Sequence, residues 1–545
     1  MIMSFDFSSR RSPVIARHGM VAASQPLAAI AGLQILMQGG NAADSAVATA
    51  AALNVTEPTS TGIGGDCFAL FYDAPTRKIT ALNGSGRAPA ALTIDFIQRQ
   101  NLQSPNLSIS DPFHALNITV PGACAGWFDL IERHGTLPMR DLLAPAIRLA
   151  EEGFPVTPTT AYFWARGVDQ QLRHAVGGNA LTIDGRAPNA GEIFRNPGLA
   201  RTFRAVAEGG KDAYYKGEIA QSIARVVGRA GGVLSAADLA AHTSTWDEPI
   251  STTYRDIRVW ECPPNGQGLA ALMALNLLEG FDLARIDPLS PARWHLLIEA
   301  MRVAFADTSW YIADPRVSHI PLDALLSKAY AAERRALIDP TKATLDTRRG
   351  APVAGSDTVY FCVVDGAGNA CSFINSNYVG FGTGIVPEGW GFTLQNRGNN
   401  FSLDPAHPNA LAPGKRPYHT IIPGMLTREK DGSLLAPFGV MGGFMQPQGH
   451  VQVVVGMVDD GLDPQAALDR PRFCLTHASP RSRVELEEGV PFQTMAALAQ
   501  MEHPVVPVTG LARAIFGRGQ IIRRDPDGVL WGGSDPRADG MAVGF

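Results

Sequence analysis

One threonine in this chain has a setting in which its side chain could serve as a catalytic nucleophile. Thr358 begins the apolar run TVYFCVV and follows a polar segment, residues 339–357, that contains many glycine, proline and arginine residues. If the Asp357–Thr358 bond were cleaved, Thr358 would gain a free α-amine with a pKa of about 7.7–8.0. That amine could accept the proton of the threonine's own hydroxyl, so no histidine or aspartate would be required. A threonine that begins a strand is more commonly a structural residue, and the pattern leaves both roles open.

Two glycine-rich segments could place backbone N–H groups around an anion. Gly442 and Gly443 lie within FGVMGGFMQPQGH, where a glycine pair by itself is more typical of a turn than of an anion hole. The segment TGIGGD, residues 61–66, lacks the Lys-Ser/Thr pair of a phosphate-binding loop and precedes a predicted strand, not a helix. We therefore do not expect this segment to bind phosphate.

Other catalytic and metal-binding patterns are missing from the sequence. It contains neither G-x-S-x-G nor H-E-x-x-H, and its 12 histidines have no metal-ligand spacing. None of its 6 cysteines forms a C-x-x-C pair, which is typical of reduced, mostly buried thiols in a cytoplasmic protein. The sequence predicts neither a metal nor a cofactor.

Local patterns predict the elements that would position these residues. Apolar side chains recur at helical spacing up to the pair Gly39-Gly40, and an alanine-rich run follows Asn41, a good N-cap. A strand, a glycine-containing turn and a returning strand predict a hairpin that begins at Thr358. The predicted helices span residues 25–38, 41–53, 139–152, 199–208, 216–229, 236–242 and 268–278, and the predicted strands span 67–72, 358–365, 370–376, 451–457 and 528–531. The region 121–337 is predicted to be mainly helical.

The overall composition excludes several classes of function. The chain has 545 residues, of which 46% are hydrophobic, and this is enough for a large core. Its net charge of −5 argues against a nucleic-acid partner. The longest aliphatic stretch, residues 46–55, is far shorter than the ~18 residues of a membrane span. Residues 1–20 contain no apolar segment of a secretory signal. We expect a cytoplasmic protein with no membrane partner.

Taken together, the motifs resemble the gamma-glutamyltransferase family of N-terminal nucleophile hydrolases along nearly the whole chain. The similarity begins at residues 19–68 (GMVAASQ to GGDCF) and continues through 117–156. It is greatest in DTVYFCVVDGAGNACSF, FGTGIVPEGWGFTLQNRGNNF and KRPYHTIIPGM, and the GVMGG glycines and SDPRADGMAVGF complete it. So many motifs in one order make Thr358 the expected nucleophile.

The resemblance implies a proenzyme with an α+β fold, a four-layer αββα sandwich. Thr358 would attack the carbonyl of Asp357 and split the chain into a large subunit, 1–357, and a small subunit, 358–545. The two would stay together as a heterodimer, which could dimerise further. Thr358 would then form an acyl-enzyme with a small-molecule amide and pass the acyl group to water or to an amino acid.

The resemblance also implies roles for residues around the nucleophile. Gly442 and Gly443 match the family's oxyanion-hole glycines, and Ser376 matches a threonine whose hydroxyl contacts the nucleophile. Other positions depart from the residues with which γ-glutamyl-binding members hold the substrate's α-amino and α-carboxylate groups. The family's acidic residue, asparagine, glutamine and paired serines correspond here to Asn400, Tyr378, Arg397, His419 and Thr420, and its arginine to Ser85, with Arg87 close by.

These departures leave two substrate classes open. Gamma-glutamyl amides such as glutathione are the family default. Without the acidic residue, however, a buried ammonium would lack a counter-charge, whereas Arg397 would favour an anion. The alternative is therefore an acylase or amidase acting on dicarboxylic monoamides of the glutaryl, cephalosporin or oxamate type. The stretch between residues 401 and 415 is short for a lid loop, which would favour hydrolysis over transfer. A hypothesis of another class, a non-catalytic binding relative, is disfavoured because Thr358 and the glycine pair are retained.

Overall fold

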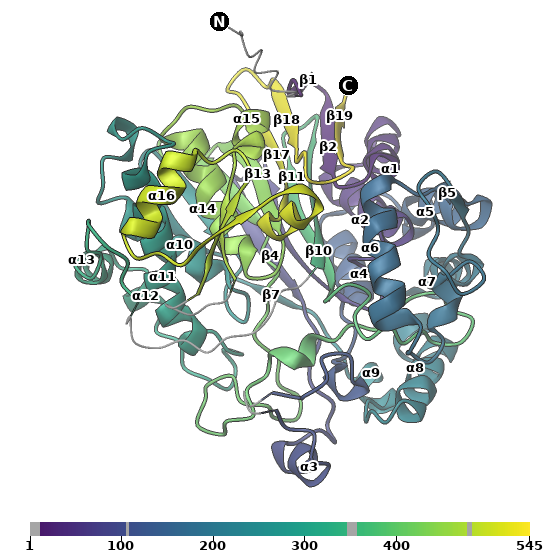
Figure 1. Ribbon diagram of the computed structural model, residues 1–545. Helices are drawn as coiled ribbons and strands as arrows, with labels where there is room; N and C mark the ends of the chain where they lie inside the picture. The colour runs from purple at the N-terminus through teal and green to yellow at the C-terminus, as the bar shows by residue number, and fades with distance from the viewer. Residues whose placement is uncertain (1–10, 105–107, 346–356, 477–481) are drawn as a thin grey trace, which may run out of the picture.

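The protein is built of four layers, in the order helix, sheet, sheet, helix (Figure 1). The computed structural model describes residues 11–104, 108–345, 357–476 and 482–545. Two antiparallel sheets of seven strands each lie face to face, and helices cover the outer face of both. This arrangement confirms the predicted α+β four-layer sandwich.

The first sheet has the predicted hairpin at its centre. Register pairs Val359 with Asn375 and Val364 with Ala370, so the two hairpin strands are aligned as the sequence predicts. The strand order is β19 (Met541–Gly544), β2 (Gly19–Ala23), β10 (Asp357–Asp365), β11 (Ala370–Tyr378), β3 (Asp66–Asp73), β4 (Lys78–Gly84) and β7 (Thr245–Asp247).

The second sheet packs over the first through a core of buried apolar side chains. The two sheets come close at the centre, where a Cβ on Gly439 would lie 2.6 Å from the ring of Tyr360. Its strand order is β1 (Val14–Ala16), β18 (Leu530–Ser534), β17 (Arg518–Arg524), β13 (Leu434–Met441), β12 (Gly424–Arg428), β9 (Ile257–Glu261) and β8 (Ile250–Tyr254).

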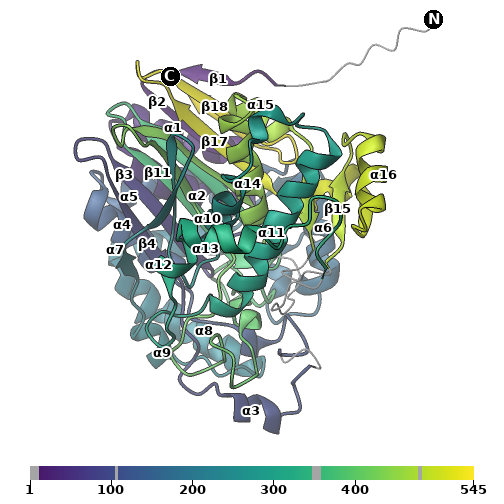
Figure 2. The ribbon, with the colours of Figure 1, turned by 90° about the vertical axis from the view of Figure 1, so that its left-hand side faces the viewer.

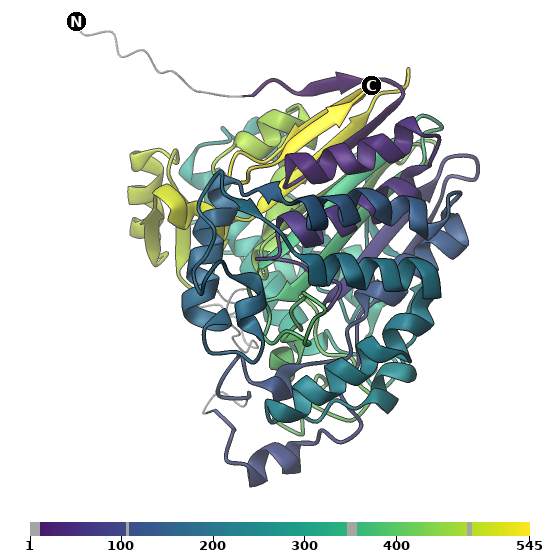
Figure 3. The same cartoon turned by 90° about the vertical axis from the view of Figure 1, so that its right-hand side faces the viewer.

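One helical layer covers the first sheet (Figure 3). Its α1 begins after Gln25 and ends before Gly39, and α2 begins with a capping box in which Asn41 and Asp44 exchange hydrogen bonds. Both helices were predicted from the sequence. The main helices of the layer are α1 (Pro26–Met37), α2 (Ala42–Thr56), α4 (Ala123–His134), α5 (Met139–Glu152), α7 (Pro197–Tyr215) and α8 (Glu218–Arg229).

The other helical layer covers the second sheet (Figure 2). It contains α10 (Gly268–Leu278), α11 (Pro291–Tyr311), α14 (Met445–Val458), α15 (Pro464–Asp469) and α16 (Phe492–Gln500). The remaining helices are α3 (Ile94–Arg99), α6 (Pro158–Gly167), α9 (Ala236–Ala240), α12 (Leu322–Leu325) and α13 (Lys328–Arg335), and the short strands are β5 (Phe154–Pro155), β6 (Ile193–Phe194), β14 (Phe473–Leu475), β15 (Val484–Glu487) and β16 (Val505–Val508). Within the described residues, no helix is long and apolar enough to cross a membrane.

One local prediction was wrong. Residues 451–457 belong to the helix α14 and not to a strand. The valines there lower helix propensity only slightly. Packing of α14 against β13 outweighs this small loss, and the packing is close, because a Cβ on Gly449 would lie 2.6 Å from Val440. The middle region, 121–337, is mainly helical as predicted, and it also contributes the edge strands β7 and β8 and the strand β9 next to β8.

Candidate active site

Thr358 and Ser376 bring two hydroxyl groups together at one end of the central hairpin. Thr358 Oγ1 lies 3.1 Å from Ser376 Oγ, and both side chains are buried. The register shifts between Asp357 and Val359, next to this pair. The backbone of β10 begins at Asp357, whose side chain lies outside the described part of the structure. Residues 346–356 of the polar segment 339–357 also lie outside the described residues.

Arg397 links the hydroxyl pair to a second group of polar side chains. Its Nη2 donates to Ser376 Oγ at 3.1 Å and its Nη1 donates to Thr420 Oγ1 at 2.8 Å. Its guanidinium lies over the ring of Tyr378, 4.5 Å from the centroid. Burial lowers the pKa of Arg397 to about 10, so the group stays charged at neutral pH. Its Nε is also buried and has no hydrogen-bond acceptor among the described residues.

Tyr378 and Asn400 form a neutral wall beside this guanidinium. The Tyr378 hydroxyl donates to Asn400 Oδ1 at 2.6 Å, and Asn400 Nδ2 donates to the Tyr418 carbonyl at 3.1 Å. Burial raises the pKa of Tyr378 to about 12, which keeps its hydroxyl protonated. The backbone of Tyr378 has a φ of 81°, a strained value for a bulky residue. The wall contributes no negative charge.

A buried carboxylate next to the cluster was missed at the sequence level. His419 Nε2 donates to Asp66 Oδ2 at 3.0 Å. Three further N–H groups donate to Asp66 Oδ1, from Gly86, Gly122 and Gln395. Burial raises the pKa of Asp66 to about 6, although the nearby Arg397 opposes that rise. Asp66 ends the GIGGD motif, but its partners lie far along the chain, so no local signal pointed to this pairing.

The glycine pair follows β13 and is held by a glutamine that the sequence analysis did not single out. Gly442 and Gly443 have φ values of 134° and 60°, conformations that favour glycine. Gln267 Nε2 donates to the Gly443 carbonyl at 2.7 Å and to the Thr420 carbonyl at 2.6 Å. The Tyr418 hydroxyl donates to Gln267 Oε1 at 3.0 Å. Gln267 thus ties the glycine loop to the segment that carries Thr420.

The structure brings together all of the predicted pocket residues except Arg87. Thr358, Ser376, Arg397 and Thr420 form one chain of contacts, with Tyr378 and Asn400 alongside and His419 behind them. Arg87 instead donates to the Thr243 carbonyl at 3.0 Å. Partial burial, together with repulsion from Arg316, lowers its pKa. A substrate-binding role for Arg87 stays a prediction.

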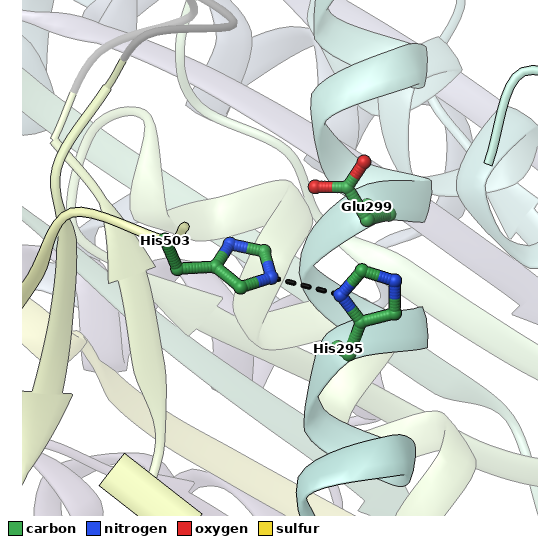
Figure 4. Close-up of side chains that lie close together, drawn as sticks. All are labelled: His295, Glu299 and His503. Carbon is green, nitrogen blue, oxygen red and sulfur yellow. Dashed lines mark hydrogen bonds between the residues drawn. The ribbon is translucent and has the colours of Figure 1, made fainter. Parts of the chain in front are cut away.

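One cluster among the described residues has the composition of a metal site, but it lies elsewhere (Figure 4). His295 and Glu299 lie one turn apart on α11, and His503 Nε2 is 2.8 Å from His295 Nδ1. The guanidinium of Arg302 lies 3.3 Å from Glu299 and already supplies a positive charge. Burial, Arg302 and His295 lower the pKa of His503 to about 3. We interpret this cluster as a hydrogen-bonded histidine pair beside an ion pair.

Comparisons with known proteins agree with this arrangement. The family model described as gamma-glutamyltranspeptidase matches residues 28–545. The chain is 36% identical to the glutathione hydrolase-like YwrD proenzyme of Bacillus subtilis, over 98% of this chain and 99% of that protein. It is 35% identical to the oxamate amidohydrolase proenzyme of Klebsiella pneumoniae, over 97% and 99%. The crystal structure of a cephalosporin acylase from Bacillus halodurans matches with a TM-score of 0.91 and 46% identity, over 100% and 98%.

Proposed function

The chain belongs to the gamma-glutamyltranspeptidase family, and from this premise we propose that it is a self-cleaving amidohydrolase with Thr358 as its nucleophile. In maturation, Thr358 Oγ attacks the carbonyl carbon of Asp357 and the acyl group shifts from nitrogen to oxygen. Water then hydrolyses the ester, which frees the α-amine of Thr358 and leaves chains 1–357 and 358–545. Both sheets contain strands from each chain, with β10 paired to β2 and β11 paired to β3. This interleaving supports a stable heterodimer after cleavage.

Catalysis follows from the same hydroxyl. The freed α-amine accepts the proton of Thr358 Oγ as the oxygen attacks the substrate's amide carbonyl. The C–O bond forms, the amide C–N bond breaks, and the proton passes to the departing amine. Water then attacks the acyl-enzyme and releases an acid. The N–H groups of Gly442 and Gly443 stabilise the oxyanion, and Ser376 contacts the nucleophile.

We propose that the substrate is a monoamide of a dicarboxylic acid and that its acyl group is of the glutaryl type. The observation that carries this proposal is the buried guanidinium of Arg397, which donates to Ser376, and Ser376 in turn contacts Thr358. The Nε–H of Arg397 has no acceptor among the described residues. A carboxylate on the substrate would accept a hydrogen bond from this N–H and would pair with the positive charge of the guanidinium. The neutral Tyr378 and Asn400 offer no counter-charge to an α-ammonium, and the oxygens of Asp66 already accept four hydrogen bonds. Gamma-glutamyl amides are the second candidate, supported by the similarity to a glutathione hydrolase-like protein.

A matched pair of substrates tests the acyl preference. Glutaryl-p-nitroanilide and γ-glutamyl-p-nitroanilide differ only in the α-ammonium group. We expect kcat/KM to be at least about tenfold higher for the glutaryl compound, equivalent to about 1.4 kcal/mol. Asn400→Asp should shift the ratio toward the γ-glutamyl compound, while Asn399→Asp, next to it in the chain, should not. Faster turnover of the γ-glutamyl compound by the wild-type protein would contradict the proposed acyl group.

A further inference from the structure

A cavity of about 430 Å³ opens beside the glycine pair. It is bordered by Met441 and Gly442 on one side and by Val379 and Gly380, just beyond the end of β11, on another. Arg397 and Asn400 are not among its lining residues. The cavity is therefore distinct from the side-chain cluster around Arg397. Its volume is in the range of small-molecule sites.

Apolar side chains form much of the wall of this cavity, beside the polar Thr59, Gln170, Gln171 and Thr476. The wall comes from α6, from the start of α14, from β14 and from the turn before β17, so both proposed subunits contribute. The apolar side chains are Phe163, Phe381, Phe444, Met445, Leu475 and Ile515. Ile515 is 41% exposed, which places an apolar side chain at the mouth. Such walls favour an aromatic or other apolar body over a small polar amine.

The charged side chains that line the cavity are all arginines. Its lining includes Arg166, Arg483 and Arg518 and contains no carboxylate from the described residues. Arg518 is already paired with Glu57 at 3.1 Å and lies over the ring of Phe163. Arg166 and Arg483 are exposed. Among the described residues, the ion pair of Arg483 is a loose one with Glu485, at 3.5 Å. Two exposed guanidinium groups are thus placed where they can attract an anion.

We propose that this cavity is the subsite for the amine half of the substrate and that it selects amines whose apolar body carries a carboxylate. The assignment rests on the proposed function, because the scissile carbonyl must lie at Gly442 to use its N–H group. With the acyl chain directed to Arg397, the amine extends from that carbonyl into the cavity. Its apolar body then packs between the phenylalanines while its carboxylate faces Arg166 and Arg483.

Binding of the free amine product tests the subsite without any turnover. The probes are 3-aminobenzoate and 3-aminobenzamide, which have nearly the same shape but differ in charge, added to the cleaved protein in a calorimeter. We expect the benzoate to bind about five- to tenfold more tightly, an effect typical of two exposed ion pairs. The double variant Arg166→Gln/Arg483→Gln should remove that preference. The control Arg173→Gln alters an exposed arginine that pairs with Asp169 and should keep it.

Kinetics with the corresponding N-glutaryl amides connects the subsite to the reaction. The ratio of kcat/KM for the benzoate amide over the benzamide amide should fall toward one in the double variant, and 0.5 M salt should lower it in the wild-type protein. Equal binding of the two amines, or no binding of either, would overturn the subsite even if glutaryl amides are hydrolysed. A carboxylate preference in binding, without turnover of any glutaryl amide, would support the subsite and reject the proposed acyl group instead.

Discussion

Gln267 provides a stringent test of how the glycine loop is positioned. Its side chain makes three buried hydrogen bonds, to the carbonyls of Gly443 and Thr420 and from the hydroxyl of Tyr418. Gln267→Leu fills the same space but leaves these three groups without that partner. Each buried polar group left unpaired costs about 1–3 kcal/mol, so with some relaxation we expect the free energy of unfolding to fall by about 3 kcal/mol.

The substitution should also lower the rate of catalysis. Loss of one oxyanion donor typically lowers kcat by about 10²–10³-fold. If the loop is displaced but not removed, part of the oxyanion stabilisation should be lost, and we expect kcat to fall by about 10–100-fold. Because Gln267 contacts the pocket residue Thr420 at its backbone carbonyl and not at its side-chain hydroxyl, KM should stay within about threefold. The measurement is steady-state kinetics with glutaryl-p-nitroanilide on protein whose cleavage has been verified by intact mass.

A matched glutamine separates positioning from stability. Gln452, on α14, also makes three hydrogen bonds, to the carbonyls of Gln448 and Phe473 and from the N–H of Phe473, but it does not contact the glycine loop. Gln452→Leu should lower Tm and leave kcat nearly unchanged. Gln267→Glu supplies a second readout, since its carboxyl must be protonated to face two carbonyls and its kcat should therefore fall as pH rises. If Gln267→Leu and Gln452→Leu have the same kcat, the positioning role is refuted.

Two further predictions concern the nucleophile and the buried carboxylate. Thr358→Ala should yield a single chain of 545 residues by intact mass and no turnover, because both steps use the same oxygen; cleavage between Asp357 and Thr358 in this variant would overturn the mechanism. The pKa of Asp66 is raised from 3.8 to about 6, so its contribution to stability is fully present below pH 3.8 and is lost as pH rises through about 6. The free energy of unfolding of wild type relative to Asp66→Asn should therefore fall by about 2 kcal/mol between pH 4 and pH 7; a difference that does not change with pH would contradict the assigned shift.

The elements that the sequence predicts correctly have local signals. The capping box at Asn41 and the turn between β10 and β11 are encoded by residues within a few positions of one another. The strand at residues 451–457 was predicted wrongly for the same reason. Its valines have a local preference for strands, but contact with β13 holds them in a helix.

The sequence by itself determined the family resemblance, the expected nucleophile Thr358 and most of the residues that now surround it. The tertiary structure alone decided that Asp66 pairs with His419, that Gln267 holds the glycine loop and that Arg87 donates to Thr243. Asp66 and His419 are 353 positions apart, and Gln267 and Gly443 are 176 apart. Contacts over such separations depend on which strands pair and how the two sheets stack, and no local pattern of residue types specifies that arrangement.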